Sequence, residues 1–109
     1  MIGLCLGAAE NRCAIVVDGF IATAAAAVAV RLCDPVRGYL FAAHRSTETG
    51  QAALLEIIGH RPLLDLGMRL GEGTGAALAI PMIRAAVEAF THMATFESAG
   101  VSDAAHGTP

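Results

Sequence analysis

Two consecutive strand–turn–helix units constrain the fold of this chain more than any other feature. The run Cys13–Val17 is short, apolar and rich in β-branched residues, which is typical of a buried parallel strand. Asp18-Gly19 then turns the chain into the alanine-rich, nearly uncharged stretch Phe20–Leu32. That composition favours a helix buried on most sides, and Asp34-Pro35 is expected to end it.

The second unit repeats the same order. It comprises a strand at Tyr39–Ala43, a polar loop at 44–47 and an amphipathic helix at Glu48–Ile58, followed by a shorter extended piece at Pro62–Leu66. The repeat predicts an α/β fold, a Rossmann-like, three-layer parallel sheet with crossover helices. Ligands of such sheets bind at the carboxyl ends of the strands. The polar residues Asp18-Gly19 and His44-Arg45-Ser46 are therefore expected on one rim.

The segment Gly71-Glu72-Gly73-Thr74-Gly75 places one carboxylate between glycines, before a helix expected from Thr74 or Gly75 toward Phe90. Glycine permits unusual backbone angles and close approach of a ligand, and amides at a helix start can point at an anion. Alternatively, the glutamate could have no chemical role and only stabilise the helix, because its negative charge lies near the positive N-terminal end of the helix dipole. This interaction contributes roughly 0.3 to 1 kcal/mol. The spacing alone leaves both interpretations open. Pro81 predicts a kink or a helix boundary.

Composition limits the kinds of partner. The chain has 109 residues, enough for one core, and 55% of them are hydrophobic although only 5% are aromatic. This apolar excess over the usual 45 to 50% or so indicates a surface that another chain or missing sequence covers. The seven basic residues are all arginines, they are scattered, and the net charge is −3. A nucleic-acid partner is therefore not expected.

Cysteine and histidine spacing predicts neither a metal site nor a cofactor. Three cysteines without a C-x-x-C pattern, Cys5, Cys13 and Cys33, indicate buried thiols in a reducing compartment. The four histidines lack metal-ligand spacing. The opening run has no basic leader, and Phe20–Val30 is shorter than the roughly 20 residues that cross a bilayer. We expect a cytoplasmic protein without a membrane partner.

Four blocks, taken together, resemble the nicotinate-nucleotide:dimethylbenzimidazole phosphoribosyltransferase family, in the family's order. They are Val17–Ile21, Ala42–Ser46, Leu64–Gly75 and Met93–Phe96. The resemblance implies that residues 1–101 are the C-terminal part of the phosphoribosyltransferase α/β domain, which N-terminal sequence completes in the family. Residues 102–109 are expected to be a disordered tail.

The resemblance implies transfer of phosphoribose from nicotinate mononucleotide to 5,6-dimethylbenzimidazole, giving α-ribazole 5′-phosphate and nicotinate in cobalamin synthesis. It makes Glu72 the general base, and an apolar, partly dry pocket would raise the pKa of that glutamate in the direction a base requires. Ser46 and Leu70 are expected on the acceptor base. The residues expected on the nucleotide are Asp18, Gly19, Gly71, Gly73, Thr74 and Gly75.

Several residues have a second interpretation. Ser46 could be a loop or helix-capping serine, and Asp18 could be only a turn-forming residue. Arg69 could neutralise phosphate or pair with Asp65, and His44 and Arg45 could be rim contacts or solvated loop residues. The expected partner is a separately encoded N-terminal part, a second copy in a homodimer, or both. The alternatives to an enzyme are a non-catalytic interaction module that retains the α/β core and a small nucleotide-binding protein.

Overall fold

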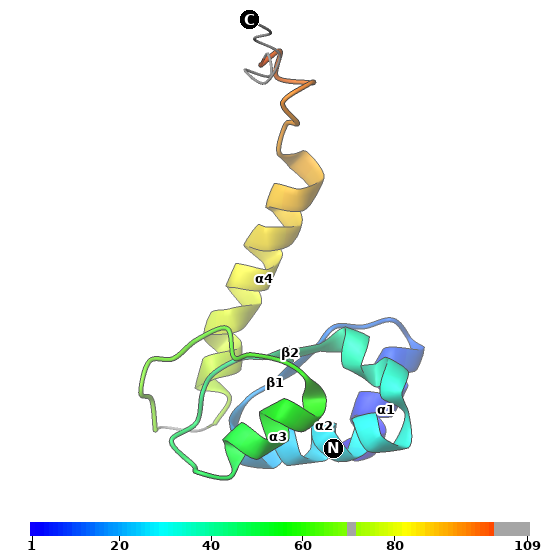
Figure 1. Ribbon diagram of the computed structural model, residues 1–109, viewed down its shortest axis with the longest axis vertical. Helices are drawn as coiled ribbons and strands as arrows, with labels where there is room; N and C mark the ends of the chain where they lie inside the picture. The colour runs from blue at the N-terminus through cyan, green and yellow to red at the C-terminus, as the bar shows by residue number, and fades with distance from the viewer. Residues whose placement is uncertain (70–71, 102–109) are drawn as a thin grey trace, which may run out of the picture.

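The computed structural model describes residues 1–69 and 72–101 of the chain (Figure 1). Both strand–turn–helix units are present, which confirms the α/β class predicted from the sequence. In chain order the elements are α1 (Ile2–Glu10), β1 (Ile15–Val17), α2 (Gly19–Leu32), the 3-10 helix η1 (Asp34–Tyr39), β2 (Leu40–Ala42), α3 (Gln51–Ile58) and α4 (Thr74–His92).

The strands β1 and β2 are parallel and pair in register, with Ile15 opposite Leu40. The extended piece predicted after α3 joins the far side of β2. There the amides of Leu63 and Leu64 donate to the carbonyls of Ala42 and Ala43, each at 2.9 Å. Three parallel segments thus lie side by side in chain order. The loops that follow them meet at one edge of the sheet, as expected for parallel strands.

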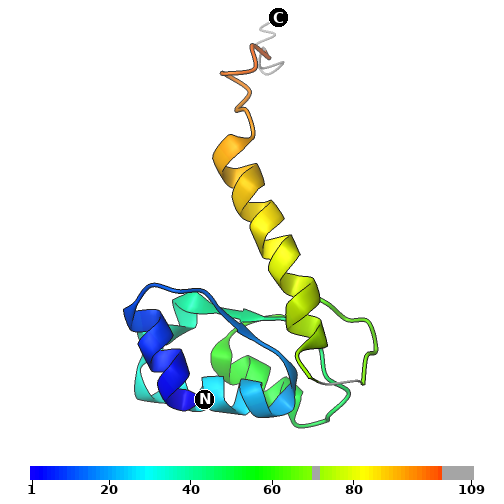
Figure 2. The ribbon, with the colours of Figure 1, turned by 180° about the vertical axis from the view of Figure 1, so that it is seen from behind.

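One face of this sheet is covered by α1, α2 and α3, and α4 leaves from the other side (Figures 1 and 2). The covered face holds the core, whose strand members are Ile15, Val17, Leu40 and Ala42. Val16 and Phe41 alternate with these residues, so they point to the opposite face, where both are only half-buried. A parallel sheet normally has helices on both faces. In the described part of the chain, the second face is left largely open.

The α2 helix supplies small buried side chains to the core, with Ala26 and Ala29 fully buried. The expectation of burial on most sides holds except along one stripe of the helix, where Ile21 and Leu32 are 74% and 68% exposed. Helices α1 and α3 pack beside α2 and the sheet lies behind it, so one side of α2 has no neighbour among the described residues. The outward apolar residues of α2 are therefore open to water.

The prediction of three buried thiols holds only for Cys5. Cys13 lies in the connection that follows α1, and Cys33 is the residue that ends α2. Connecting segments run over the surface. Both thiols are exposed for that reason, although apolar residues flank them in the sequence.

Two helix boundaries differ from the sequence prediction. The helix expected from Glu48 begins at Gln51, because the amide of Glu48 donates to Ser46 Oγ at 3.1 Å and holds a turn before the helix. Pro81 lies inside α4 and sets no boundary. The ring removes the donor for the carbonyl of Ala77, but both residues are exposed, so water can bond to that carbonyl.

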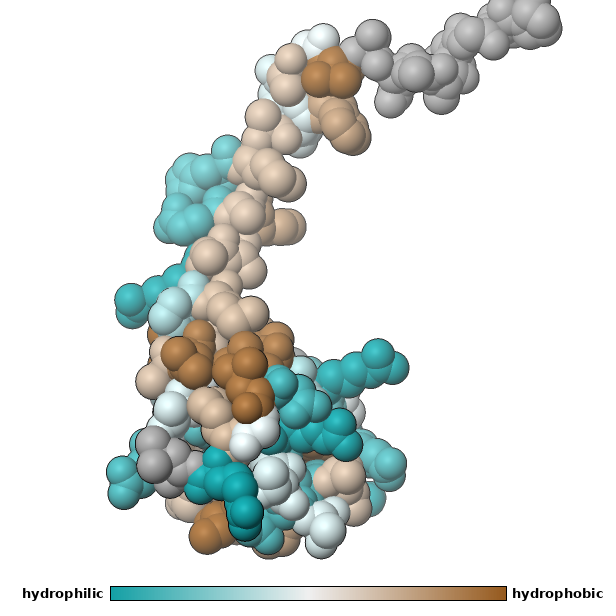
Figure 3. All heavy atoms as spheres, turned by 90° about the vertical axis from the view of Figure 1, so that its left-hand side faces the viewer, coloured by the Kyte–Doolittle hydropathy of each residue, from teal (hydrophilic) through white to brown (hydrophobic). Residues whose placement is uncertain are grey.

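The α4 helix projects away from the rest of the molecule (Figures 1 and 2). The radius of gyration is 18.0 Å, against about 13 Å for a compact chain of this length. Only Gly75 and Ala79, near its start, are buried. Apolar side chains cover much of its length (Figure 3), and no helix among residues 1–69 and 72–101 is long and apolar enough to cross a membrane. The predicted tail at 102–109 lies outside the described residues.

Candidate functional site

A pocket of about 440 Å³ opens at the edge where the parallel segments end. It is lined by the β1–α2 junction, the loop after β2, residues 68–69 and the turn that begins α4. The shared rim predicted from the sequence is therefore present. Among the predicted site residues, the structure brings together Asp18, Gly19, Ser46, Glu72, Gly73, Thr74 and Gly75. The predicted Leu70 and Gly71 lie outside the described residues.

Asp18 joins the end of β1 to the start of α4. It precedes α2, but its side chain makes no capping hydrogen bond to that helix. Instead, Oδ2 accepts the amide of Ala76 at 3.2 Å, from a residue 58 positions along the chain. A carboxylate at this place suits the positive end of the α4 dipole. The interpretation of Asp18 as a local turn former is wrong, because its carboxylate caps a distant helix.

Gly75 is buried where α4 meets Asp18 and His44. A Cβ atom at this position would lie 2.6 Å from Cβ of His44 and 2.9 Å from Cγ of Asp18, and it would also overlap Oδ1 of Asp18. Heavy atoms of a folded protein do not approach so closely without displacement. Glycine is therefore required here by close packing between the helix start and the sheet edge.

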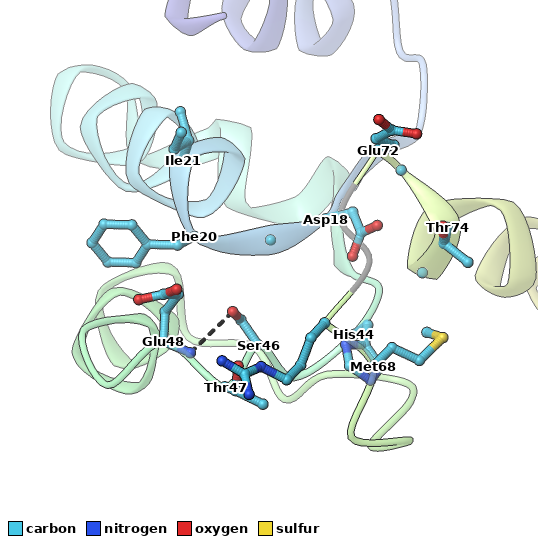
Figure 4. A pocket seen from close by; sticks show the side chains of 14 residues that line it. Asp18, Phe20, Ile21, His44, Ser46, Thr47, Glu48, Met68, Glu72 and Thr74 are labelled. Atoms are coloured by element: carbon cyan, nitrogen blue, oxygen red, sulfur yellow. Dashed lines mark hydrogen bonds between the residues drawn. The ribbon is translucent and has the colours of Figure 1, made fainter.

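Glu72 adopts a left-handed backbone conformation, with φ of 59°, and Gly73 follows with φ of 78°. This conformation costs a residue with a side chain roughly 1 to 2 kcal/mol. The side chain lines the pocket but is exposed, and Figure 4 shows its carboxylate pointing away from Asp18 and Ser46. The apolar, partly dry surroundings predicted for this glutamate are not supplied by the described residues. Strained residues of this kind cluster at functional sites.

Ser46 lies on the loop below the start of α2, which carries Phe20 and Ile21 (Figure 4). Its hydroxyl oxygen accepts the amide of Glu48. The loop-serine interpretation therefore describes a real contact, and Ser46 lines the pocket as well. One side chain thus both shapes the turn and faces the cavity.

The three basic residues left open by the sequence have different surroundings. His44 is 5% exposed, and its Nε2 accepts the amide of Leu66 at 3.0 Å, so it is neither solvated nor loosely held. Arg45 does not line this pocket, and it pairs with Asp65 at 3.2 Å. The expected alternative pair between Arg69 and Asp65 is therefore not formed, because Asp65 pairs with Arg45. Arg69 instead lines the pocket, where a cation can face an anionic ligand.

Sequence reasoning missed Gln51, which is buried below the pocket. Its Oε1 accepts the amide of Ser46 at 2.5 Å, and its Nε2 donates to the carbonyl of His44 at 3.2 Å and to Thr23 Oγ1 at 3.4 Å. A glutamine at a helix start ordinarily faces solvent. Its partner Thr23 gives no signal in the sequence, because the Thr23 hydroxyl also donates to the Gly19 carbonyl of its own helix.

The site therefore combines three features around an open pocket: the carboxylate of Glu72 on a strained backbone, the start of α4, and Arg69. The Ala76 amide already bonds to Asp18, so an anion at this helix start must use other donors of the turn or Arg69. Glu72 lines the same pocket, where its carboxylate could accept a proton from a bound group. This arrangement suits proton removal next to a phosphate-bearing ligand.

Comparison with known proteins finds related sequences and a related fold. A family model described as phosphoribosyltransferase matches residues 1–101. The chain is 58% identical over 101 residues to nicotinate-nucleotide–dimethylbenzimidazole phosphoribosyltransferase of Geobacter sulfurreducens, covering 93% of this chain and 29% of the relative. It is 57% identical over 102 residues to the protein of the same name from Vibrio atlanticus, covering 94% of this chain and 30% of that relative.

A crystal structure of nicotinate-nucleotide–dimethylbenzimidazole phosphoribosyltransferase from Thermus thermophilus superposes with a TM-score of 0.86 at 49% identity. The match covers 94% of this chain and 31% of that one. The chain thus spans less than a third of the length of these relatives. With its matching sequence and fold, the chain belongs to the phosphoribosyltransferase family that includes these dimethylbenzimidazole enzymes.

Proposed function

We propose that this chain is the C-terminal, base-bearing part of an enzyme that transfers phosphoribose from nicotinate mononucleotide to 5,6-dimethylbenzimidazole. The observation that carries the proposal is the left-handed turn that holds Glu72 on the same pocket as Asp18 and Ser46. The names of the similar proteins supply the substrates.

In the proposed reaction, Glu72 accepts the N–H proton of the benzimidazole. The other ring nitrogen attacks C1′ of the ribose and its lone pair forms the new bond. The bond from C1′ to the nicotinate nitrogen breaks, and nicotinate leaves with the two electrons of that broken bond. Attack opposite the leaving group inverts the β-linkage to α. Ser46 and Leu70 contact the acceptor, and the nucleotide is held by Asp18, Gly19, Gly71, Gly73, Thr74 and Gly75.

The proposal requires a covering segment that the described residues do not include. Glu72 is exposed here, and a carboxylate open to water is a weak base for this step. Substrate-positioning groups also contribute large effective concentrations, so their loss lowers the rate by several powers of ten. We therefore expect turnover only when the remaining part of the family's chain is present.

The remaining part of the family's chain would pack on the uncovered face of the sheet and on the side of α4 that faces it. Phe41 and Leu63 line a groove of about 410 Å³ together with residues of α4 that include Met82, Val87 and Phe90. The lining is almost wholly apolar, and Phe90 is 90% exposed. Covering such a surface is favourable by about 25 cal/mol per Å² of apolar area. We propose that the N-terminal part of the family's chain, separately encoded or from the same gene, packs here.

The test combines this chain with the segment of the Geobacter sulfurreducens relative that lies outside the match. Nicotinate mononucleotide and dimethylbenzimidazole are added, and nicotinate release is followed. Glu72→Gln should lower the rate by about 10²- to 10⁴-fold, the usual worth of a general base. Glu10→Gln, a matched change at an exposed carboxylate in α1 outside the pocket, should leave it unchanged. Equal rates for wild type and Glu72→Gln would refute the role of Glu72.

The same mixture distinguishes the non-catalytic alternative, which the exposed apolar side of α4 also suits. An interaction module would bind the added segment, with a rise in molar mass, but would release no nicotinate. A homodimer would form without the added segment. Light scattering during size-exclusion chromatography separates these outcomes.

A further inference from the structure

The side chain of Gln51 connects the two backbone segments that flank the pocket, although it does not line the pocket itself. It is 2% exposed and lies in the first turn of α3. Its amide oxygen accepts the Ser46 amide, and its amide nitrogen donates to the carbonyl of His44. Both of these bonds hold the loop after β2.

The second connection runs through Thr23. The amide nitrogen of Gln51 also donates to Thr23 Oγ1, and this hydroxyl in turn donates to the carbonyl of Gly19 at 2.7 Å. Gly19 is the first residue of α2 and lines the pocket. One buried amide therefore links the Gly19 side of the pocket to its Ser46 side.

The direction of these bonds specifies glutamine. The Oε1 atom meets an N–H group, whereas Nε2 meets a carbonyl and a hydroxyl whose proton is already given to Gly19. A glutamate would place a second oxygen against the His44 carbonyl, and an apolar side chain would leave the Ser46 amide and the His44 carbonyl without these partners. A buried polar group that loses its hydrogen-bond partner destabilises the fold by about 1 to 3 kcal/mol. The surroundings therefore favour glutamine over glutamate or an apolar residue at this position.

We propose that Gln51 is a positioning residue, which sets the location of Ser46 relative to Gly19 and hence the fit of the acceptor base. This inference rests on the proposed function for its catalytic consequence. The geometric part stands separately, because it concerns only the order of the loop.

The first experiment measures amide hydrogen exchange by NMR on the chain itself. Gln51→Met keeps the volume of the side chain and removes its hydrogen bonds. Exchange at the Ser46 amide should become about tenfold faster or more, while Ala29 and Ile58 keep their protection. Ile58→Val, a core truncation outside the network, is the control for general loss of stability. Unchanged Ser46 exchange, or the same pattern in Ile58→Val, would overturn the proposal.

A second variant separates the two connections. Thr23→Val keeps the shape of the side chain but removes the hydroxyl, so it breaks the link to Gly19 and leaves the Gln51 bond to the Ser46 amide. Exchange at Ser46 should change less than about threefold. A loss of Ser46 protection equal to that in Gln51→Met would contradict a direct role of the glutamine amide.

The kinetic experiment uses the complemented assembly described above. Gln51→Met should raise KM for dimethylbenzimidazole about tenfold and change KM for nicotinate mononucleotide much less, since Ser46 is on the acceptor side. Ile58→Val should change neither. If the wild-type assembly releases no nicotinate, the proposed function fails while the exchange result still decides the positioning role. If it turns over and Gln51→Met leaves both KM values unchanged, the catalytic consequence is refuted.

Discussion

Replacing Gly75 with alanine tests the junction between α4 and the sheet edge. The added Cβ would lie 2.6 Å from Cβ of His44, so α4 must shift and the Ala76 amide must leave Asp18. Overpacking costs about 1 to 3 kcal/mol and loss of a cap about 0.5 to 2 kcal/mol. Alanine returns up to about 1 kcal/mol through helix propensity. With that gain subtracted, the net penalty for docking the α4 start is roughly 0.5 to 4 kcal/mol.

The expected result is local, because only Gly75 and Ala79 of α4 are buried. Amide exchange at Ala76 and Ala77 should become at least about twofold faster, whereas amides in α2 keep their protection. Gly7→Ala is the matched control, since nothing lies within 4 Å of a Cβ atom there, and it should stabilise the chain by up to about 1 kcal/mol. If Gly75→Ala leaves exchange at Ala76 unchanged, the close packing argued here is wrong.

Four further outcomes follow from the described contacts. Glu72→Gly should raise the free energy of unfolding by about 1 kcal/mol in urea titration, because glycine accepts the left-handed backbone, while activity of the assembly is lost. Burial raises the pKa of the Cys5 thiol above 9.0, so its contribution to stability is full below that pH and declines as the pH rises through the folded pKa; pH-dependent denaturation measures this. At pH 8, alkylation followed by mass spectrometry should modify Cys13 and Cys33 but spare Cys5. Phe90→Asp should leave the unfolding of the isolated chain within about 0.5 kcal/mol yet prevent binding of the added segment, as light scattering would show.

Sequence patterns predicted the parts of the fold that depend on local order. The apolar β-branched run of β1 and the alanines of α2 predict a strand and a helix from local sequence alone. The parallel arrangement of the strands then places Asp18 and Ser46 on one rim. The Gly73-Thr74 turn likewise predicted where α4 begins. These features required no knowledge of contacts between distant segments.

Contacts between distant segments were not predictable in the same way. The bond from Asp18 to Ala76 spans 58 positions, and nothing beside Asp18 distinguishes this cap from an ordinary turn. Gln51 was hidden for the same reason, since its partner Thr23 is 28 positions away. The exposure of Glu72 differed from expectation because burial depends on what covers the pocket. The apolar excess indicated an uncovered surface, but only the structure located it on α4.

The isolated position of α4 has a consequence for the life of this polypeptide in a cell. A helix of 19 residues that is anchored at one end only gains little from tertiary packing, which is the source of most helical stability in proteins. Its unfolded form presents apolar sequence to proteases and chaperones, which remove such chains continuously. We therefore expect the cellular abundance of this protein to follow the supply of whatever covers α4, with surplus copies degraded.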